Sequence, residues 1–272
     1  MTTSPRAFVA RLVALVSGLA LAAVACADVS NSPTQVASLE FVRVPVPAIE
    51  IGDSLRDTLG IAVPVRAIAR SLSGEEILDA PLRYTARESL LVIDSLSGHV
   101  VPDSSMRPGE VNVVARFADA LQIATRLRIT RRPDTAFRTD TASLRLTPGA
   151  IGQTAVDSNS VAIEVRVQGP DTTGTRVGIA DWLVRFAVVQ PANPGNDTTA
   201  AVFLIDDNAR PSRFDTTASA TGLASRRVRV RESLFPAAGV SEDTVVVEAA
   251  VVRRGQPVAG APIRIVVPVR RP

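Results

Sequence analysis

Short runs of β-branched and other apolar residues, separated by turn residues, constrain the fold of this chain more than any other feature. In the first half the runs span 38–44, 60–69, 82–86, 90–93, 111–117 and 122–129. Glycine-containing turns at 52–54, 73–75, 97–98 and 107–109 separate them. Strands spaced by about 8–12 residues with such turns are typical of a β-sandwich or barrel. Past the N-terminus no amphipathic helical pattern occurs, so the sequence predicts an all-β chain.

A second series of strand-like runs follows a polar interval at 133–141, which contains Pro133 and lacks apolar periodicity. The runs span 142–146, 161–167, 182–189, 201–205, 226–231, 244–252 and 263–269. Each half has roughly the 100 residues of one immunoglobulin-like sandwich. We therefore expect two tandem domains, 36–132 and 142–272, joined by a linker at 133–141.

The N-terminus has the pattern of an export signal. Arg6 and Arg11 precede an apolar run over 12–25 that contains no acidic residue and ends in small residues. This run is shorter than the ~20 apolar residues that a membrane-spanning helix needs. Residues 1–25 are therefore predicted to be a signal peptide.

Cys26 is the single cysteine and directly follows the apolar run. The segment Leu21–Cys26 resembles a lipoprotein lipobox, which implies diacylation of Cys26 and a tether over 26–35. Two lipid chains suffice for stable membrane attachment. Ala23 stands where lipoboxes usually have leucine, and 23–25 also fits ordinary signal-peptidase cleavage, which would leave a free thiol. Both outcomes remain open at this point.

Ala27, in place of an aspartate after Cys26, favours the outer membrane by resemblance to Gram-negative lipoproteins. Without lipid the protein would be secreted. The membrane, through the N-terminal anchor, is the first expected partner.

The charge inventory argues against nucleic acid as a partner. All 30 basic residues are arginine, and the isoelectric point near 10.2 reflects the absence of lysine and the single tyrosine. Loss of residues 1–25 would leave 28 arginines against 27 acids, a net charge of +1. One cysteine and one histidine exclude a disulfide framework, a thiolate metal cluster and a multi-histidine site. No cofactor or metal is expected.

The first half resembles a bacterial Ig-like group 2 domain. The resemblance rests on Gly52-Asp53-Ser54, on the strand, Gly turn and strand over 91–100, and on a closing strand at 109–115. Tyr84 stands where that family usually has tryptophan. The second half is similar to invasin/intimin-type Ig-like repeats at 184–188, 217–224 and 243–249. These resemblances imply two tandem Ig-like sandwiches over about 36–270.

Arg227, Arg229 and Arg231 form the sharpest local pattern. Alternation with valine places the three guanidinium groups on one face of a strand. They are candidates for contact with an anion such as a lipid phosphate or an acidic polysaccharide. A solvated strand face that discourages sheet aggregation is the alternative interpretation.

Trp182 is the candidate ligand contact, since aromatic side chains can form a platform for a sugar. Core packing is the favoured interpretation for most of the aromatic residues in strand runs and the alternative for Trp182, whose ring Asp181 and the flanking loop can leave partly exposed. His99 lies in a turn without a nucleophile motif. Asp206-Asp207 could offer oxygen ligands to calcium, but asparagine- and aspartate-type turn bonding is the simpler interpretation.

Asp-Thr-Thr recurs at 171, 197 and 215, where it is interpreted as turn and strand-edge usage. No catalytic residue is assigned, so the chain is not predicted to be an enzyme. The sequence therefore predicts an exported cell-envelope protein with an adhesive, surface-display or structural role and a protein or polysaccharide partner. The alternative is a carbohydrate-binding accessory protein that uses Trp182 and adjacent loops.

Overall fold

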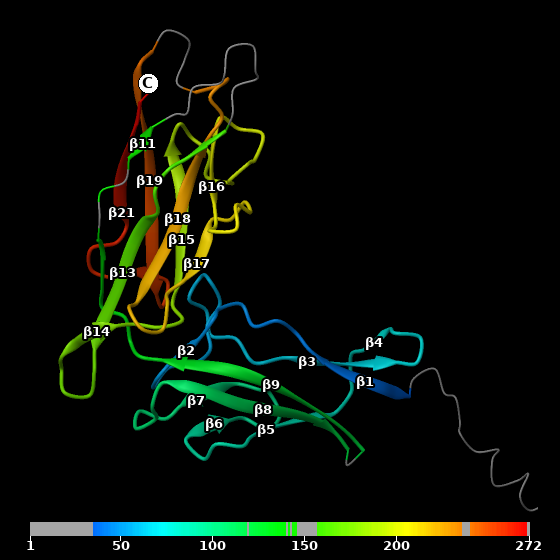
Figure 1. The fold of residues 1–272 in the computed structure, drawn as a ribbon. Helices are drawn as coiled ribbons and strands as arrows, with labels where there is room; N and C mark the ends of the chain where they lie inside the picture. Colours follow the sequence, from blue (N-terminus) through cyan, green and yellow to red (C-terminus); the bar gives the residue numbers. More distant parts are fainter. Residues whose placement is uncertain are drawn as a thin grey trace, which may run out of the picture. The chain divides into compact units, whose positions relative to one another are not determined.

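The computed structural model describes residues 35–118, 120–139, 141, 143–145, 157–235 and 240–270. The predicted signal peptide, Cys26 and the tether up to residue 34 lie outside this part of the chain. Within it the regular elements are β-strands, which confirms the all-β fold class (Figure 1). None of the described residues forms a helix long and apolar enough to cross a membrane.

Contacts divide the chain into a small unit, Met1–Glu40 with Ile68–Ala80, and a large unit, Phe41–Ala67 with Pro81–Pro272. The small unit contains most of the sheet formed by β1 (Val36–Phe41), β3 (Ala67–Ser71) and β4 (Glu76–Ile77), in the order β1-β3-β4. The predicted turn at 73–75 joins β3 to β4, which pair antiparallel. Arg70 and Glu40 form an ion pair of 2.8 Å within this unit.

The first core of the large unit lies against a four-stranded sheet in the order β2-β9-β8-β5. These strands are β2 (Ile49–Glu50), β5 (Leu82–Ala86), β8 (Gly109–Phe117) and β9 (Leu121–Thr130). A hairpin of β6 (Leu91–Ile93) and β7 (Val100–Pro102) lies in the same part of the chain. The alternating residues of β8 give Val111, Val113 and Ala115 to the core, as period-two patterning requires.

Tyr84 takes a buried position in this first core, with 6% of its surface exposed. Its hydroxyl oxygen accepts a hydrogen bond of 3.0 Å from the backbone N–H of Ala67. A buried tyrosine needs such a partner for its polar end. Tyr84 therefore packs as a core residue, as the sequence interpretation of the aromatic residues expected.

The second core lies between two six-stranded sheets. One sheet contains β10 (Thr135–Arg138), β12 (Ser158–Asn159), β13 (Ile163–Pro170), β14 (Arg176–Gly178), β16 (Val202–Ile205) and β18 (Leu223–Val230). The other contains β11 (Leu144–Arg145), β15 (Leu183–Gln190), β17 (Phe214–Thr216), β19 (Glu242–Arg253), β20 (Gln256–Pro257) and β21 (Ile263–Arg270). This second half is thus a β-sandwich.

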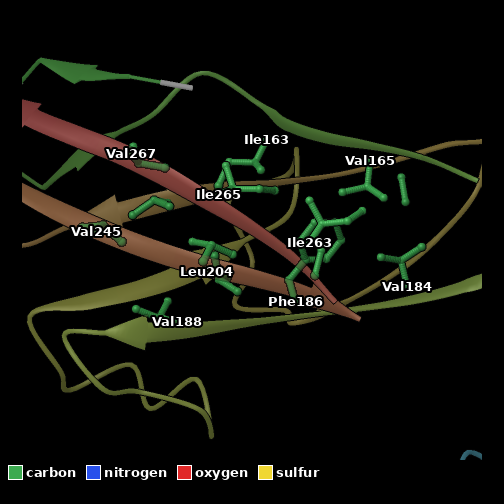
Figure 2. Packing of buried hydrophobic residues seen from close by; sticks show 14 of the residues in the cluster. Ile163, Val165, Val184, Phe186, Val188, Leu204, Val245, Ile263, Ile265 and Val267 are labelled. Atoms are coloured by element: carbon green, nitrogen blue, oxygen red, sulfur yellow. The ribbon is translucent and has the colours of Figure 1, made fainter. Parts of the chain in front are cut away.

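Figure 2 shows how side chains from both sheets meet in this core. Ile163 and Val165 come from β13, and Phe186, which is fully buried, comes from β15. Every second residue of β21 from Ile263 to Val269 is buried. Burial of apolar surface at about 25 cal/mol per Å² is the main stabilising contribution of such a core.

Two expectations about the elements were wrong. The interval 133–141 was expected to be a linker, but it contains β10, which pairs antiparallel with β13 from Thr135 to Arg138. The run 60–69 is not one strand, because β3 begins only at Ala67. Pro64 lacks the backbone N–H that a continuous ladder needs at this point.

Candidate functional site

The predicted arginine row lies on β18 with the expected alternation. Val228 and Val230 are fully buried, whereas Arg227 is exposed and Arg229 is partly exposed. The Nε of Arg229 donates to Asn159 Oδ1 at 2.9 Å, and Arg227 lies 3.4 Å from an oxygen of Asp207. These contacts tie the row to neighbouring segments of the same sandwich.

Arg231 follows the end of β18 and is also engaged within the protein. Its guanidinium lies 5.7 Å from the ring centroid of Phe203 and donates to the backbone oxygen of Thr198. All three arginines of the row therefore have intramolecular partners, which favours the structural interpretation of the row over anion binding.

Trp182 lies immediately before β15 and is partly buried against the second core. Its backbone N–H donates to the Thr217 hydroxyl at 2.8 Å, which fixes the start of the strand. The residue also lines a cavity of about 420 Å³ in the large unit. This volume is in the range of small-molecule sites in proteins. Trp182 is therefore both a packing residue and part of a concave surface.

The cavity is formed by segment 46–60, by β15 and the segment before it, by residues 213–214 and by the end of β19 with its turn. On β15, Arg185 pairs in register with Phe214 of β17 and with Ala250 of β19. Side chains at paired positions point to the same face of a sheet. Because Val184 and Phe186 are buried in the core, this is the outer face of the sheet.

The two most buried carboxylates of the cavity wall are neutralised by arginines. Glu50, which is 6% exposed, accepts hydrogen bonds from the Nε and Nη2 of Arg253 at 2.8 and 2.6 Å. Asp53, which is 7% exposed, accepts from Arg254 Nε at 2.8 Å and from Arg56 at 2.9 Å. Bidentate arginine–carboxylate pairs are among the strongest hydrogen-bonded contacts in proteins.

The environment of Asp53 keeps it ionised. Burial raises the pKa of this carboxyl, but the hydrogen bonds from Arg56 and Arg254 outweigh burial and hold the pKa below its ordinary value of 3.8. The hydrogen bond to Asp53 in turn raises the pKa of Arg56, and that to Glu50 raises the pKa of Arg253. The carboxylates of Glu50 and Asp53 are thus held in ion pairs with the guanidinium groups of Arg253, Arg254 and Arg56.

Asp57 and Asp181, the other carboxylates of the wall, also have partners. Asp57 Oδ1 accepts the backbone N–H groups of Leu59 and Ile61, both at 2.9 Å. Asp181 lies 3.1 Å from Arg128, whose pKa the contact raises. Glu50, Asp53 and Asp181 are thus paired with arginines, whereas Asp57 is bonded to backbone N–H groups.

Two cations of the wall, Arg185 and Arg213, have no carboxylate partner among the described residues. Arg185 is exposed, and no described carboxylate forms an ion pair with it. Arg213 stacks over Phe214, with its Cζ 4.9 Å from the ring centroid, and donates one N–H to the carbonyl of Pro194 at 3.1 Å. A guanidinium has five N–H donors, so most donors of Arg213 remain available.

A close backbone approach shapes one edge of the cavity. A Cβ on Gly60, whose φ is +86°, would lie 2.2 Å from the backbone nitrogen of Gly255. Arg254 and Gly255 both have positive φ and form the tight turn from β19 into β20. Glycine at position 60 is therefore required for the segment 46–60 to reach this turn.

The other sequence candidates lie away from the cavity. His99 is exposed in the turn between β6 and β7. Asp206 Oδ1 accepts the N–H groups of Asn208 and Arg210, which confirms the turn interpretation of Asp206-Asp207. Asp171 and Asp197 bond to threonines two residues later in the same way. Among the described residues no group of three or more His, Cys, Asp or Glu side chains is placed to hold a metal ion.

Sequence reasoning missed most of the cavity. Glu50, Asp53, Arg185, Arg213 and Phe214 come from separated segments, and no local motif joins them. The Gly52-Asp53-Ser54 segment carried a signal, but it was interpreted as a turn. Trp182 is the one predicted site residue that the structure places at this cavity.

Comparison with known proteins assigns no family. No protein-family model and no curated protein matches the sequence. Solved structures that match include domains 4–9 of the surface layer protein SbsC, at 13% identity and a TM-score of 0.28 over 88% of this chain and 30% of that one. Extracellular cadherin domains 1–5 of protocadherin gamma B2 match at 11% identity and a TM-score of 0.27, over 88% of this chain and 40% of that one.

The ectodomain of human desmocollin-1 matches at 12% identity and a TM-score of 0.25, over 86% of this chain and 42% of that one. The chain thus spans less than half the length of each of these three structures. Similarity at this level does not assign the chain to a family or a role.

Proposed function

We propose that this chain is an exported cell-envelope protein, anchored by lipid on Cys26, with a non-catalytic adhesive or structural role. The sequence supports export through residues 1–25 and anchoring through the lipobox-like segment Leu21–Cys26. The observation that supports a non-catalytic role is the pairing of Glu50 with Arg253 and of Asp53 with Arg254. These buried charged groups hold segments together and are not poised for proton transfer.

The pairing also suits a load-bearing or displaying protein. Glu50 belongs to the strand that pairs with β9 of the first core, whereas Arg253 ends β19 of the second core. Contacts of this kind oppose independent movement of the segments that carry the two cores. A rigid support is what exposed loops need to meet a partner in a defined geometry.

The anchoring part is tested by replacing the cysteine in the full chain. Cys26→Ser should move the protein from the membrane fraction to the soluble fraction, and Ser30→Ala, in the same tether, should leave it in the membrane fraction. Intact-mass analysis of the wild-type protein should show a lipid adduct on the chain that starts at residue 26. Membrane retention of Cys26→Ser, or a mass without lipid, would contradict the anchor.

Carbohydrate binding is a second candidate function, supported by the cavity at Trp182. It combines Trp182 and Phe214 with polar groups, the composition that concave ligand sites commonly have. Purified mature protein should sediment with isolated envelope polysaccharide, and Phe214→Ala should weaken this. Phe214 is 39% exposed and can be truncated without opening the core. Unchanged sedimentation of the variant would argue against this site.

A further inference from the structure

We propose that the Trp182 cavity binds an acidic saccharide, with the carboxylate of a uronic acid held by Arg185 and Arg213. This proposal rests on the carbohydrate-binding candidate function and names the chemical class of its ligand. The feature that carries it is an imbalance of charge in the cavity. Three of the four wall carboxylates (Glu50, Asp53 and Asp181) are paired with arginines, whereas Arg185 and Arg213 have no carboxylate partner among the described residues.

The two buried carboxylates of the wall cannot serve as ligand-binding charges. Asp53 is held by Arg56 and Arg254, and Glu50 is held by both nitrogens of one edge of Arg253. Release of either carboxylate would leave a buried charge without a partner, which is strongly unfavourable. A cationic ligand would have to break these pairs to use either of the two carboxylates.

Arg185 and Arg213 are both neighbours of Phe214. Arg185 is opposite Phe214 in the ladder between β15 and β17, and Arg213 precedes it and stacks on its ring. Both arginines also line the cavity, so their guanidinium groups can converge on one small anion there. The planar guanidinium forms two parallel hydrogen bonds with a carboxylate, which a neutral sugar hydroxyl cannot match.

The apolar part of the cavity suits the ring of a sugar. Trp182, Phe214 and Val252 line it together, and Phe214 and Val252 are exposed at 39% and 36%. The C–H face of a pyranose can pack on such a surface while its carboxylate points to the arginines. Exposed apolar side chains beside unpaired cations thus fit a ring that carries one negative charge.

The test measures binding of full-length mature protein to trisaccharides of galacturonic, glucuronic and mannuronic acid and to their carboxyl-reduced neutral counterparts. At least one acidic trisaccharide should bind about tenfold or more tightly than its neutral counterpart, because a charge-assisted bidentate contact is lost on reduction. Added salt should weaken the acidic ligand selectively.

Variants then locate the contact. Arg185→Gln and Arg213→Gln should each lower the affinity for the acidic trisaccharide by about tenfold and leave that for the neutral one unchanged. Arg227→Gln removes the same charge from the paired row on β18 and should have no effect. Trp182→Ala and Phe214→Ala should each lower the affinity for the acidic and the neutral trisaccharide alike. Phe214→Ala provides this measurement if Trp182→Ala fails to fold.

The outcomes separate the two claims. Equal affinity for acidic and neutral trisaccharides, with loss on Phe214→Ala alone, overturns the acidic specificity and leaves a sugar site. Absence of binding to every trisaccharide overturns both the acidic specificity and the carbohydrate-binding candidate function. The proposed envelope role is tested separately by the Cys26→Ser experiment. Binding of a phosphorylated sugar but of no uronic acid would overturn the carboxylate assignment.

Discussion

Asp53 remains charged although it is among the most buried polar residues of the protein. One arginine partner, Arg56, is three residues away, and the other, Arg254, lies at the turn after β19. Their hydrogen bonds outweigh the effect of burial and lower the pKa of the carboxyl. A lowered pKa in the folded state means that ionised Asp53 stabilises the fold.

This shift predicts acid sensitivity. The stabilisation from Asp53 is complete above the ordinary aspartate pKa of 3.8 and is lost as the pH falls through the lower value of the folded state. The free energy of unfolding of the wild type should therefore fall more steeply below about pH 4 than that of Asp53→Asn. Urea unfolding at a series of pH values measures this, and parallel curves would contradict it.

Gly60 is one of the glycines at which backbone geometry allows no side chain. Gly60→Ala should lower the free energy of unfolding by more than Gly52→Ala, because its Cβ would lie 2.2 Å from the Gly255 nitrogen. Gly52 also has a positive φ, of +75°, but nothing lies within 4 Å of its Cβ position. The control should therefore lose only the roughly 1–2 kcal/mol of the left-handed conformation. Equal losses in urea unfolding would show that the close approach costs nothing.

At the scale of elements, the buried Asn193 connects several parts of the loop between β15 and β16. Asn193, which is 7% exposed, donates from Nδ2 to the backbone oxygens of Asp197 and Val202, at 2.9 and 2.8 Å. Its Oδ1 accepts the N–H of Asp197 at 2.8 Å. One amide thus satisfies three backbone groups that the loop would otherwise leave unpaired.

Asn193→Ala should therefore destabilise the protein by about 2–3 kcal/mol, since it leaves buried backbone groups without partners. Asn208→Ala, at an exposed position of a nearby turn, should change stability by less than about 0.5 kcal/mol. Thermal unfolding measures the difference, and hydrogen exchange should show faster exchange across residues 191–201 in the first variant. A similar small effect of both would disprove the structural role of Asn193.

The elements themselves could be predicted where side chains alternate. Strands such as β8, β19 and β21 bury every second residue or a continuous valine run, and the sequence shows this directly. Short strands such as β14 and β17 could not be found, since three residues give no measurable period. β10 was missed because its sequence, Thr-Ala-Phe-Arg, buries one side chain fully and pairs mainly through its backbone.

At the scale of the whole molecule, the pair between Glu50 and Arg253 joins residues more than two hundred positions apart in the chain. Such a contact is invisible to local sequence patterns, which explains why the cavity wall was not predicted. Trp182 could be singled out because it is the one tryptophan. Arg185 and Arg213 could not, since the sequence contains 30 basic residues and only pairing distinguishes them.

Removal of one partner of this pair should be costly. Arg253→Met should lower the free energy of unfolding by about 3 kcal/mol, because the Glu50 carboxylate is left buried and unpaired. The double variant Glu50→Gln with Arg253→Met should recover part of this loss. Arg270→Met, which breaks an exposed pair with Glu242, should cost less than about 1 kcal/mol. A loss at Arg253 no larger than at Arg270 would refute the role of the buried pair.

Every ion pair described above uses arginine, because the chain contains no lysine. A lysine side chain loses its charge near pH 10.4, whereas a guanidinium keeps its charge beyond pH 12. The ion pairs at Glu50 and Asp53 therefore persist in alkaline solution, where a lysine would lose its charge and its ion pair. Acid breaks these ion pairs because it protonates the carboxylates, whereas the protein retains them in an alkaline environment.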